Sequence, residues 1–174
     1  MTAVCELRVV FLVGASGVGK TAVTEVLATR SPWKGAVSHF DDIGVPLPEE
    51  MERRFGSGES WQEWATRQWV SDLVERPGPY QLLEAQTRPS FINAALAPHR
   101  HVHPTIVLLD CRADVRASRL SRPPRHRPEL VTPRMEQWAA YLRGQADALG
   151  LPVIDTSDRS LEEVAACVEE VALG

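Results

Sequence analysis

The stretch LRVVFLVGASGVGKT, at residues 7–21, decides the fold of this chain. Its first seven residues are almost all apolar, as expected of a central strand that is covered on both faces. The rest matches the pattern Gly-x-x-x-x-Gly-Lys-Thr, in which glycines let the backbone amides turn toward phosphate oxygens. A helix that begins at Lys20 adds its N-terminal amides to the same anion. The stretch therefore predicts a phosphate-binding loop made of Gly14, Ala15, Ser16, Gly17, Val18, Gly19, Lys20 and Thr21.

Two side chains at the end of this loop carry the expected chemistry. Lys20 places a mobile positive charge against the β- and γ-phosphates of a nucleoside triphosphate. The Thr21 hydroxyl is the kind of group that coordinates Mg²⁺ in such loops. The loop follows a buried-type strand and opens a helix, which is the context that the motif requires. ATP and Mg²⁺ are therefore the expected cofactors.

The rest of the chain alternates between apolar runs and longer segments with helical periodicity. This alternation is typical of βαβ units and predicts the α/β class with a parallel sheet. Ser60 and Glu63 have the spacing of a capping box, which predicts the start of one helix. The length fits a single domain over residues 1–174. We expect strands over 7–13, 36–40, 80–85, 105–110 and 152–155, and helices over 21–29, 49–54, 60–75 and 161–173.

Composition narrows the functional class. The formal net charge is −4, whereas proteins that coat nucleic acid nonspecifically are usually basic. No apolar run is long enough to span a membrane, and the N-terminus shows no signal-peptide pattern. The cysteines, Cys5, Cys111 and Cys167, lie far apart without metal-type spacing. We therefore expect a cytoplasmic protein with no membrane partner.

Acidic side chains lie in or just after three of the expected strands. In open α/β sheets, ligands bind outside the carboxyl ends of the strands, so these positions favour a functional role. Asp41 and Asp42 follow the second strand, where a carboxylate can orient an acceptor hydroxyl and take its proton. Glu84 is expected to hold Mg²⁺, with Asp42 as a further metal ligand and Asp110 as a competitor. Either member of the aspartate pair can instead cap the turn that follows.

Polar residues after the third strand suggest an acceptor site. Gln86 and Arg88 can fix the acceptor through hydrogen bonds, and the alternative for Arg88 is a buried ion pair or a solvated strand end. Four tryptophans also raise the possibility of an aromatic substrate cage. At helical spacing they favour the core, although Trp61 or Trp64 can contact the acceptor. The four tryptophans concerned are Trp61, Trp64, Trp69 and Trp138.

Seven arginines lie between residues 112 and 134, against two acids in the same segment. Three of them, Arg116, Arg119 and Arg122, recur at three-residue spacing on a predicted helix. Such a concentration of positive charge in an acidic chain indicates an anion nearby. We expect Arg119 and Arg122 to contact ATP, and Arg119 to neutralise charge on the transferred phosphoryl group. The alternative is a solvated helix face followed by a surface loop.

Together, several segments resemble the small P-loop kinases. This group includes shikimate kinase, gluconate kinase, adenylylsulfate kinase, chloramphenicol phosphotransferase and the kinase domain of polynucleotide kinase. The resemblance implies a three-layer P-loop fold with a five-stranded parallel sheet in the order 2-3-1-4-5 and helices on both faces. It also implies an arginine-rich lid over about 112–134 that closes over ATP. The segments that carry the resemblance are the phosphate loop, Asp41-Asp42, residues 116–127, Asp155-Thr156-Ser157 and residues 161–164.

The resemblance implies an ATP-dependent phosphotransferase that acts on a hydroxyl of a small molecule, with Asp41 as the base. Its expected catalytic residues are Asp41, Lys20, Arg119 and Arg88. One alternative is a nucleotide or polynucleotide 5′-hydroxyl kinase. The acidic balance disfavours the polynucleotide form, as does Gly44, which stands where polynucleotide kinases carry an arginine. A further alternative is a nucleotide-dependent switch that hydrolyses slowly and acts by binding a partner.

Overall fold

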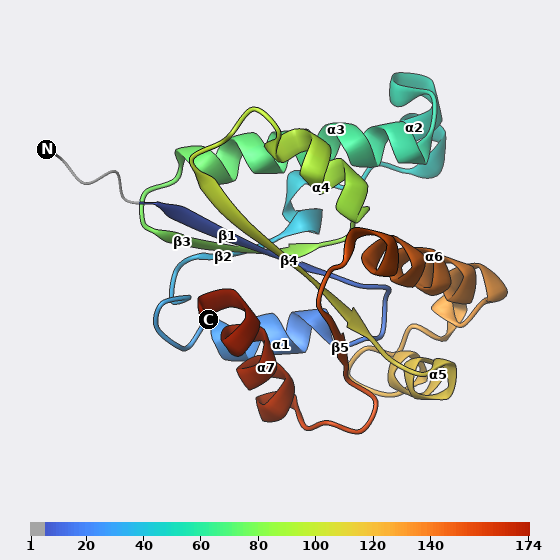
Figure 1. Cartoon of the computed structure of the whole chain (residues 1–174). Coiled ribbons are helices and arrows are strands. Elements are labelled where there is room, and N and C mark those ends of the chain that lie inside the picture. Colours follow the sequence, from blue (N-terminus) through green and yellow to red (C-terminus); the bar gives the residue numbers. More distant parts are fainter. Residues whose placement is uncertain (1–5) are drawn as a thin grey trace, which may run out of the picture.

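The computed structural model describes residues 6–174 and centres on a five-stranded parallel sheet (Figure 1). Its strands are β1 (Leu7–Val13), β2 (Val37–His39), β3 (Tyr80–Ala85), β4 (Val102–Asp110) and β5 (Val153–Asp155). They lie in the order β2-β3-β1-β4-β5, which confirms the expected order. Because the strands are parallel, their carboxyl ends meet at one edge, and ligands bind at that edge in such sheets.

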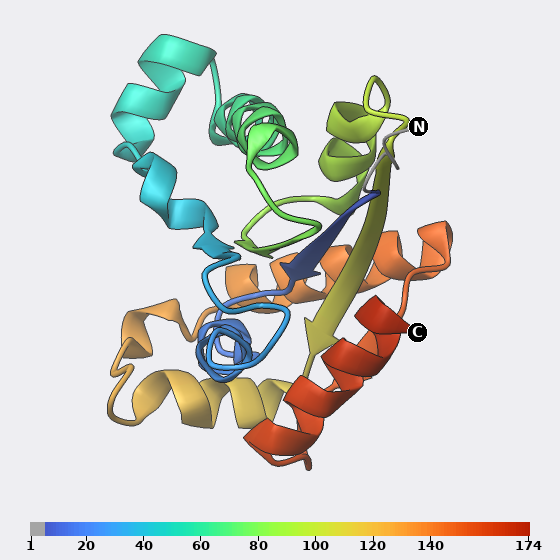
Figure 2. The same ribbon diagram turned by 90° about the vertical axis from the view of Figure 1, so that its left-hand side faces the viewer.

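Helices cover both faces of the sheet, as expected for a three-layer α/β fold. They are α1 (Lys20–Leu27), α2 (Pro48–Phe55), α3 (Gly58–Glu75), α4 (Pro89–Leu96), α5 (Ala113–Ser121), α6 (Pro133–Leu149) and α7 (Leu161–Leu173). Figure 2 shows α2 and α3 on one side of the sheet and α1 and α7 on the other. In β1, Val9 and Phe11 join the core under α3, whereas Val10 and Leu12 join the core under α1 and α7. Burial on both faces explains why this strand is continuously apolar.

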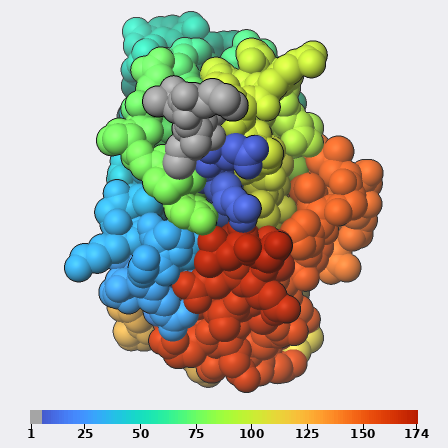
Figure 3. Space-filling model, turned by 60° about the vertical axis from the view of Figure 1, so that its left-hand side comes forward, coloured from blue at the N-terminus to red at the C-terminus, as the bar shows by residue number. Residues whose placement is uncertain are grey.

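The C-terminal helix packs beside the helix that carries the phosphate loop. Figure 3 shows α7, in red, next to the light-blue segment that follows α1. In that segment, Arg30 forms ion pairs with Glu162 and, at 3.0 Å, with Glu169 of α7. These contacts hold α7 against the same side of the sheet as α1.

The start of α3 differs from the prediction. Ser57 is the N-cap, because its Oγ accepts a hydrogen bond from the Ser60 backbone amide at 3.0 Å. The helix therefore begins at Gly58, and the predicted capping box from Ser60 to Glu63 is wrong. Ser57 has the extended backbone of an N-cap residue, whereas Ser60 already lies within the first turn of the helix.

Two helices, α4 and α6, were not among the predicted elements. Each carries a proline at its N-terminal end, Pro89 in α4 and Pro133 in α6, where the missing amide hydrogen costs nothing. Of the tryptophans, Trp61 and Trp69 are buried in the core, whereas Trp64 is 40% exposed. The core interpretation is therefore confirmed for Trp61 and Trp69. Within residues 6–174, no helix combines the length and the apolar content that crossing a membrane requires.

The second strand is shorter than expected. It covers only Val37–His39, and a 3-10 helix over Phe40–Ile43 follows it. The pair Asp41 and Asp42 therefore lies in a turn of helix rather than in extended chain. This turn places the pair just beyond the carboxyl end of β2, at the ligand-binding edge of the sheet.

Candidate active site

The phosphate loop occupies residues 14–19, between β1 and α1, and two of its glycines have no room for a side chain. A Cβ on Gly14 would meet the Leu109 carbonyl oxygen at 2.6 Å. A Cβ on Gly17 would meet side-chain atoms of Arg116 and Leu120 at 2.9 Å, and its φ of +87° also favours glycine. The loop backbone thus packs directly against β4 and α5, which fixes its shape before any ligand binds.

Lys20, the first residue of α1, lies beneath this loop. Its side chain is only 4% exposed, and its Nζ donates hydrogen bonds to the carbonyl oxygens of Gly14 at 2.7 Å and Ala15 at 3.2 Å. Lys20 has no ion-pair partner within the described part of the chain. Burial lowers the pKa of Lys20 to about 8, although the nearby Glu84 carboxylate acts in the opposite direction. A buried cation that has no acidic partner among residues 6–174 fits a site that is built for phosphate.

A small cavity brings together Thr21 and two of the predicted acids, Asp41 and Glu84. Thr21 Oγ1 donates a hydrogen bond to Glu84 Oε1 at 2.9 Å. Asp41 enters the same cavity from the end of β2. The cavity has a volume of about 210 Å³ and is lined by Thr21, His39, Phe40, Asp41, Glu84, Gln86 and Arg125.

The acids that were predicted to compete for this site are placed differently. Asp41 and Asp42 are both exposed, but only Asp41 lines the cavity. Asp110 forms ion pairs with Arg116 at 3.2 Å and with Arg143 at 3.7 Å, away from Thr21. Of the acids considered for Mg²⁺, Glu84 is therefore the one in contact with Thr21.

The environment of Asp41 perturbs its carboxyl group. Partial burial raises the pKa of Asp41 above its ordinary value, and the neighbouring Glu84 carboxylate raises it further. Lys20 and Arg125 act in the opposite direction but do not cancel these effects. Asp41, Glu84 and Arg125 thus line one small cavity, with the Lys20 charge close enough to influence Asp41, an arrangement common at sites of proton and phosphoryl transfer.

A larger cavity of about 540 Å³ adjoins the outer side of the loop. One of its walls is fixed by Arg119 of α5, which donates to Thr156 Oγ1 at 2.8 Å and to the Thr156 carbonyl oxygen at 2.6 Å. Both residues also hydrogen-bond the Val18 carbonyl oxygen. The cavity is lined by Gly17, Val18, Gly19, Thr21, Ala22, Val23, Glu25, Arg119, Arg122, Pro123, Pro124, Arg125, Thr156, Arg159, Leu161 and Val164.

Arginines of the segment over 112–134 have different environments. Arg122, the residue after α5, lines the large cavity, and its nucleotide contact stays a prediction. Arg125 lines both the large cavity and the small one. Arg125 also has no ion pair with any described residue, so its charge remains available to a ligand that spans the two cavities.

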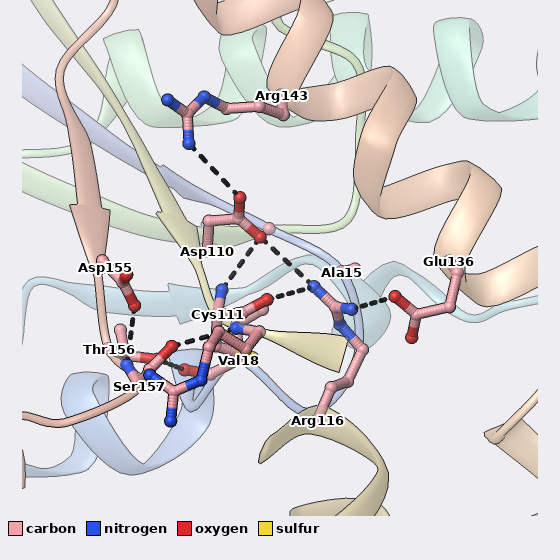
Figure 4. A network of polar contacts seen from close by, with 12 residues as sticks. Ala15, Val18, Asp110, Cys111, Arg116, Glu136, Arg143, Asp155, Thr156 and Ser157 are labelled. Carbon is pink, nitrogen blue, oxygen red and sulfur yellow. Dashed lines mark hydrogen bonds and ion pairs between the residues drawn. The ribbon is translucent and has the colours of Figure 1, made fainter. Parts of the chain in front are cut away.

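Arg116 lines neither cavity, although it has the same helical spacing as Arg119 and Arg122. It is 2% exposed and forms ion pairs with Asp110 at 3.2 Å and Glu136 at 2.5 Å (Figure 4). Its guanidinium also donates to the Cys111 carbonyl oxygen at 3.0 Å. Arg116 thus connects β4, α5 and α6 behind the phosphate loop. It has neither of the two predicted environments, the ligand site and the solvated helix face.

Arg88 lines a third cavity. Its guanidinium hydrogen-bonds Gln62, pairs with Glu59 at 3.1 Å, and lies 5.1 Å from the centre of the Trp138 ring. Gln62 in turn donates to the Gln86 carbonyl oxygen at 2.9 Å, which connects this cavity to the small one. The third cavity measures about 530 Å³ and is lined by Gly58, Glu59, Gln62, Arg88, Glu129, Leu130, Thr132, Arg134, Met135 and Trp138.

Four residues of the site were not among the predicted site residues: His39, Gln62, Arg125 and Thr156. Arg125 was within reach of sequence reasoning, because it lies in the arginine-rich segment. Thr156 follows the last predicted strand, at the edge where ligands bind. His39 and Gln62 gave no signal, because their roles depend on neighbours that are distant in the sequence.

A strand, a glycine-rich loop and a buried lysine at the start of a helix, together with this sheet order, define the P-loop α/β fold. Neither the family models nor the curated proteins contain a match to the sequence. Solved structures do match. A gluconokinase from Sinorhizobium meliloti 1021 aligns with a TM-score of 0.61 at 17% identity, over 97% of this chain and 94% of that chain.

Two further kinases show the same likeness. A shikimate kinase from Acinetobacter baumannii, in complex with shikimate, aligns with a TM-score of 0.56 at 21% identity, over 96% of this chain and 93% of that one. A sugar kinase from Janibacter sp. HTCC2649 aligns with a TM-score of 0.56 at 18% identity, over 95% and 93%. At these identities the likeness establishes the fold. The resemblance to small P-loop kinases is thus confirmed for the architecture.

Proposed function

We propose that the protein is an ATP-dependent phosphotransferase that moves the γ-phosphoryl group to a hydroxyl of a small molecule. The observation that carries this proposal is the small cavity shared by Thr21, Glu84 and Asp41. It adjoins the phosphate loop on one side and connects through Gln86 and Gln62 to the third cavity on the other. In this proposal the nucleotide, the metal and the acceptor therefore occupy neighbouring cavities, with the proposed base, Asp41, in the small cavity between the other two.

The large cavity fits the nucleotide. Arg119, Arg122 and Arg125 provide positive charge beside the loop amides, and Leu161 and Val164 of α7 provide apolar surface for a base. In this arrangement the ammonium of Lys20 exchanges the carbonyl oxygens of the loop for phosphate oxygens. Phosphates are the stronger partners because they are charged. The proposal therefore assigns nucleotide binding to the loop, Lys20, Arg119 and Arg122.

The small cavity fits Mg²⁺. This ion keeps most of its waters and is usually held by one or two protein oxygens together with substrate phosphates. Thr21 and Glu84 are such a pair, because they lie 2.9 Å apart at the end of the loop. When bound, the metal neutralises charge on the β- and γ-phosphates. Asp42 is outside this cavity, so the proposal no longer includes it among the metal ligands.

Asp41 is the proposed base. Its carboxylate accepts the proton of the acceptor hydroxyl while the hydroxyl oxygen forms a bond to the γ-phosphorus. The bond between that phosphorus and the bridging oxygen to the β-phosphate breaks, and ADP leaves. Arg125 lines this cavity and Lys20 lies under the adjoining phosphate loop, and in the proposal both stabilise the negative charge of the transferred group. A raised pKa of Asp41 favours proton uptake at this position.

The third cavity is the proposed acceptor site. Gln62 and Arg88 offer hydrogen-bonding groups, and the Trp138 ring offers an apolar face. Glu59 pairs with Arg88, which leaves Arg134 as the lining arginine without an acidic partner among residues 6–174. A small polar molecule with several hydroxyls and one acidic group matches this lining. The gluconokinase and the shikimate kinase are named for the small hydroxylated acids gluconate and shikimate, and a related acceptor is proposed here.

Release of ADP from Mg·ATP tests this proposal, with a panel of sugar acids, neutral sugars, aminoglycosides, nucleosides and 5′-hydroxyl oligonucleotides. Asp41→Asn is measured in parallel, and Asp42→Asn serves as the matched control, since Asp42 lies outside the cavity. We expect one acceptor class to stimulate release. The stimulation should fall by about 10²- to 10⁴-fold in Asp41→Asn and persist in Asp42→Asn.

Three outcomes contradict the proposal. Stimulation that survives in Asp41→Asn removes this residue from the base role. A slow hydrolysis that no acceptor stimulates, and that Asp41→Asn leaves unchanged, points instead to a nucleotide-dependent switch. Stimulation by oligonucleotides alone would transfer the assignment to a polynucleotide kinase.

A further inference from the structure

His39 makes the shortest contact to the proposed metal-binding carboxylate. Its Nδ1 lies 2.5 Å from Glu84 Oε2, while the other oxygen, Glu84 Oε1, accepts the hydrogen bond from Thr21 at 2.9 Å. Both oxygens of Glu84 are thus held by protein groups, one from the phosphate loop and one from β2. The carboxylate itself is largely buried, with 12% of its side chain exposed.

The sheet explains why these two side chains meet. β2 and β3 are parallel neighbours, and His39 and Glu84 are register partners in that pairing. Register partners on adjacent strands project to the same face, side by side. His39 is also the last residue of β2, two positions before Asp41. It therefore stands between the proposed base and the proposed metal ligand, in the wall of the small cavity.

We propose that His39 is a positioning residue that orients the Glu84 carboxylate for Mg²⁺ bound with ATP. This inference rests on the metal site described under the proposed function. With its proton on Nδ1, His39 donates to Glu84 Oε2 and prevents the carboxylate from rotating. Glu84 Oε1 then stays aimed at the Thr21 hydroxyl proton. Because the Thr21 hydroxyl proton is committed to Glu84, a lone pair of the Thr21 oxygen would be left free to hold Mg²⁺.

Groups behind a metal ligand affect the metal measurably. Partners that hold a ligand carboxylate or imidazole in place typically change metal affinity or activity by about 10- to 100-fold when they are removed. If His39 only filled space, its loss would affect nucleotide binding equally with and without Mg²⁺. A positioning role instead predicts a loss confined to the metal-dependent part of binding.

Binding of a non-hydrolysable ATP analogue distinguishes these roles, and no acceptor is required. The Kd is measured by calorimetry in excess Mg²⁺ and again in EDTA for the full chain and its variants. We expect His39→Ala to weaken binding about 10-fold in Mg²⁺ and less than about 2-fold in EDTA. A Mg²⁺ titration at fixed analogue concentration should show a matching rise in the apparent Kd for the metal.

Two conservative variants sharpen the test. The amide nitrogen of His39→Asn lies at the position of Nδ1 and can donate to Glu84, so this variant should recover most of the affinity in Mg²⁺. The amide nitrogen of His39→Gln corresponds to Nε2 instead, and this variant should behave like His39→Ala. His101→Ala is the matched control. His101 is exposed and lies just before β4, at the amino ends of the strands, whereas His39 lies at their carboxyl ends.

The proposal is overturned if His39→Ala weakens binding equally in Mg²⁺ and EDTA, or if the Asn and Gln variants are indistinguishable. Should His39→Ala fail to fold, the comparison of Asn with Gln still decides the matter. The test is separable from the proposed function, because metal-dependent nucleotide binding does not require a phosphoryl acceptor. An active kinase with an unaffected His39→Ala variant would reject the inference about His39 alone.

Discussion

Arg119 and Thr156 are 37 residues apart in the sequence, yet two hydrogen bonds of 2.8 and 2.6 Å join them beside the phosphate loop. Thr156 Oγ1 also donates to the Val18 carbonyl oxygen at 2.9 Å. The hydroxyl thus links α5, the residue after β5 and the loop in one buried contact. An uncharged side chain, that of Thr156, thus helps to hold Arg119 in the wall of the proposed nucleotide cavity.

Thr156→Val should therefore weaken both folding and nucleotide binding. The substitution keeps the side-chain volume but removes the hydroxyl, which is one of the two acceptors that Thr156 offers Arg119 and the donor to Val18. The expected loss of unfolding free energy is about 1–3 kcal/mol, measured by urea denaturation. ATP affinity should fall several-fold, because Arg119 loses one of its three hydrogen bonds beside the loop. Thr29→Val is the control, since its hydroxyl bonds only the Val26 carbonyl oxygen on the surface. Equal effects of the two substitutions would contradict this view of Thr156.

Arg125→Ala tests the arginine that faces both cavities. Arg125 makes no ion pair within the described residues, so its removal should leave the folded structure intact. If it stabilises the transferred phosphoryl group, kcat should fall by about 10²- to 10³-fold, while the Kd for ATP changes little. Arg127→Ala, in the same segment, is the matched control because Arg127 already pairs with Glu129. A loss that appears only in the Kd would assign Arg125 to ground-state nucleotide binding.

Arg116→Met should instead act on stability. The variant leaves Asp110 and Glu136 without their strongest partner at a position that is 2% exposed. Removal of one member of a fully buried ion pair typically costs about 3–5 kcal/mol. Because Asp110 is 22% and Glu136 43% exposed, the expected loss lies below that range and is measurable as a lower urea midpoint. Arg112→Met, which breaks an exposed pair with Asp158, should unfold near the parent midpoint. A midpoint for Arg116→Met close to that of Arg112→Met would show that the buried network contributes little.

The contrast between Arg116 and Arg119 shows what sequence reasoning could and could not predict. Local patterns sufficed for β1 and for β3, whose bounds match the prediction, and for the phosphate loop. Both arginines fit the same helical spacing, but their environments depend on Asp110, Glu136 and Thr156, which come from other elements. No local pattern reports such partners.

Contacts and conformations that local patterns do not report also explain why the contact of His39 with Glu84 and the N-cap of α3 were not predicted. Glu84 was expected near Mg²⁺ from its place in the third strand, whereas the contribution of His39 follows from the register between β2 and β3. Ser57 and Ser60 are equally good caps by composition, and the backbone conformation of Ser57 decides between them. Pairings across the sheet and the conformation of single turns are therefore what the sequence pattern leaves open.

Lys20 makes nucleotide binding and stability depend on pH in opposite ways. Its pKa, lowered by burial from 10.5 to about 8, means that the folded protein without nucleotide binds this proton less tightly than the unfolded chain does. Stability of the free protein should therefore rise between pH 8 and 10.5, by up to about 3 kcal/mol, as the unfavourable buried charge is lost. Urea midpoints across this range measure the effect, and Lys20→Met, which has no charge, should show a smaller rise.

Nucleotide affinity should show the reverse dependence, because only the protonated form of Lys20 attracts phosphate. Above pH 8, each unit of pH should raise the Kd for ATP by up to about 10-fold, until the pKa of Lys20 in the complex is reached. Below pH 8 the side chain is already charged, so its contribution to the affinity should be constant. Calorimetry at pH 8.5 in buffers of different ionisation enthalpy should detect uptake of a fraction of a proton on binding. Absence of proton uptake, with a Kd independent of pH from 7 to 9.5, would mean that Lys20 remains fully charged beneath the empty loop. Its hydrogen bonds to Gly14 and Ala15 would then outweigh the cost of burial.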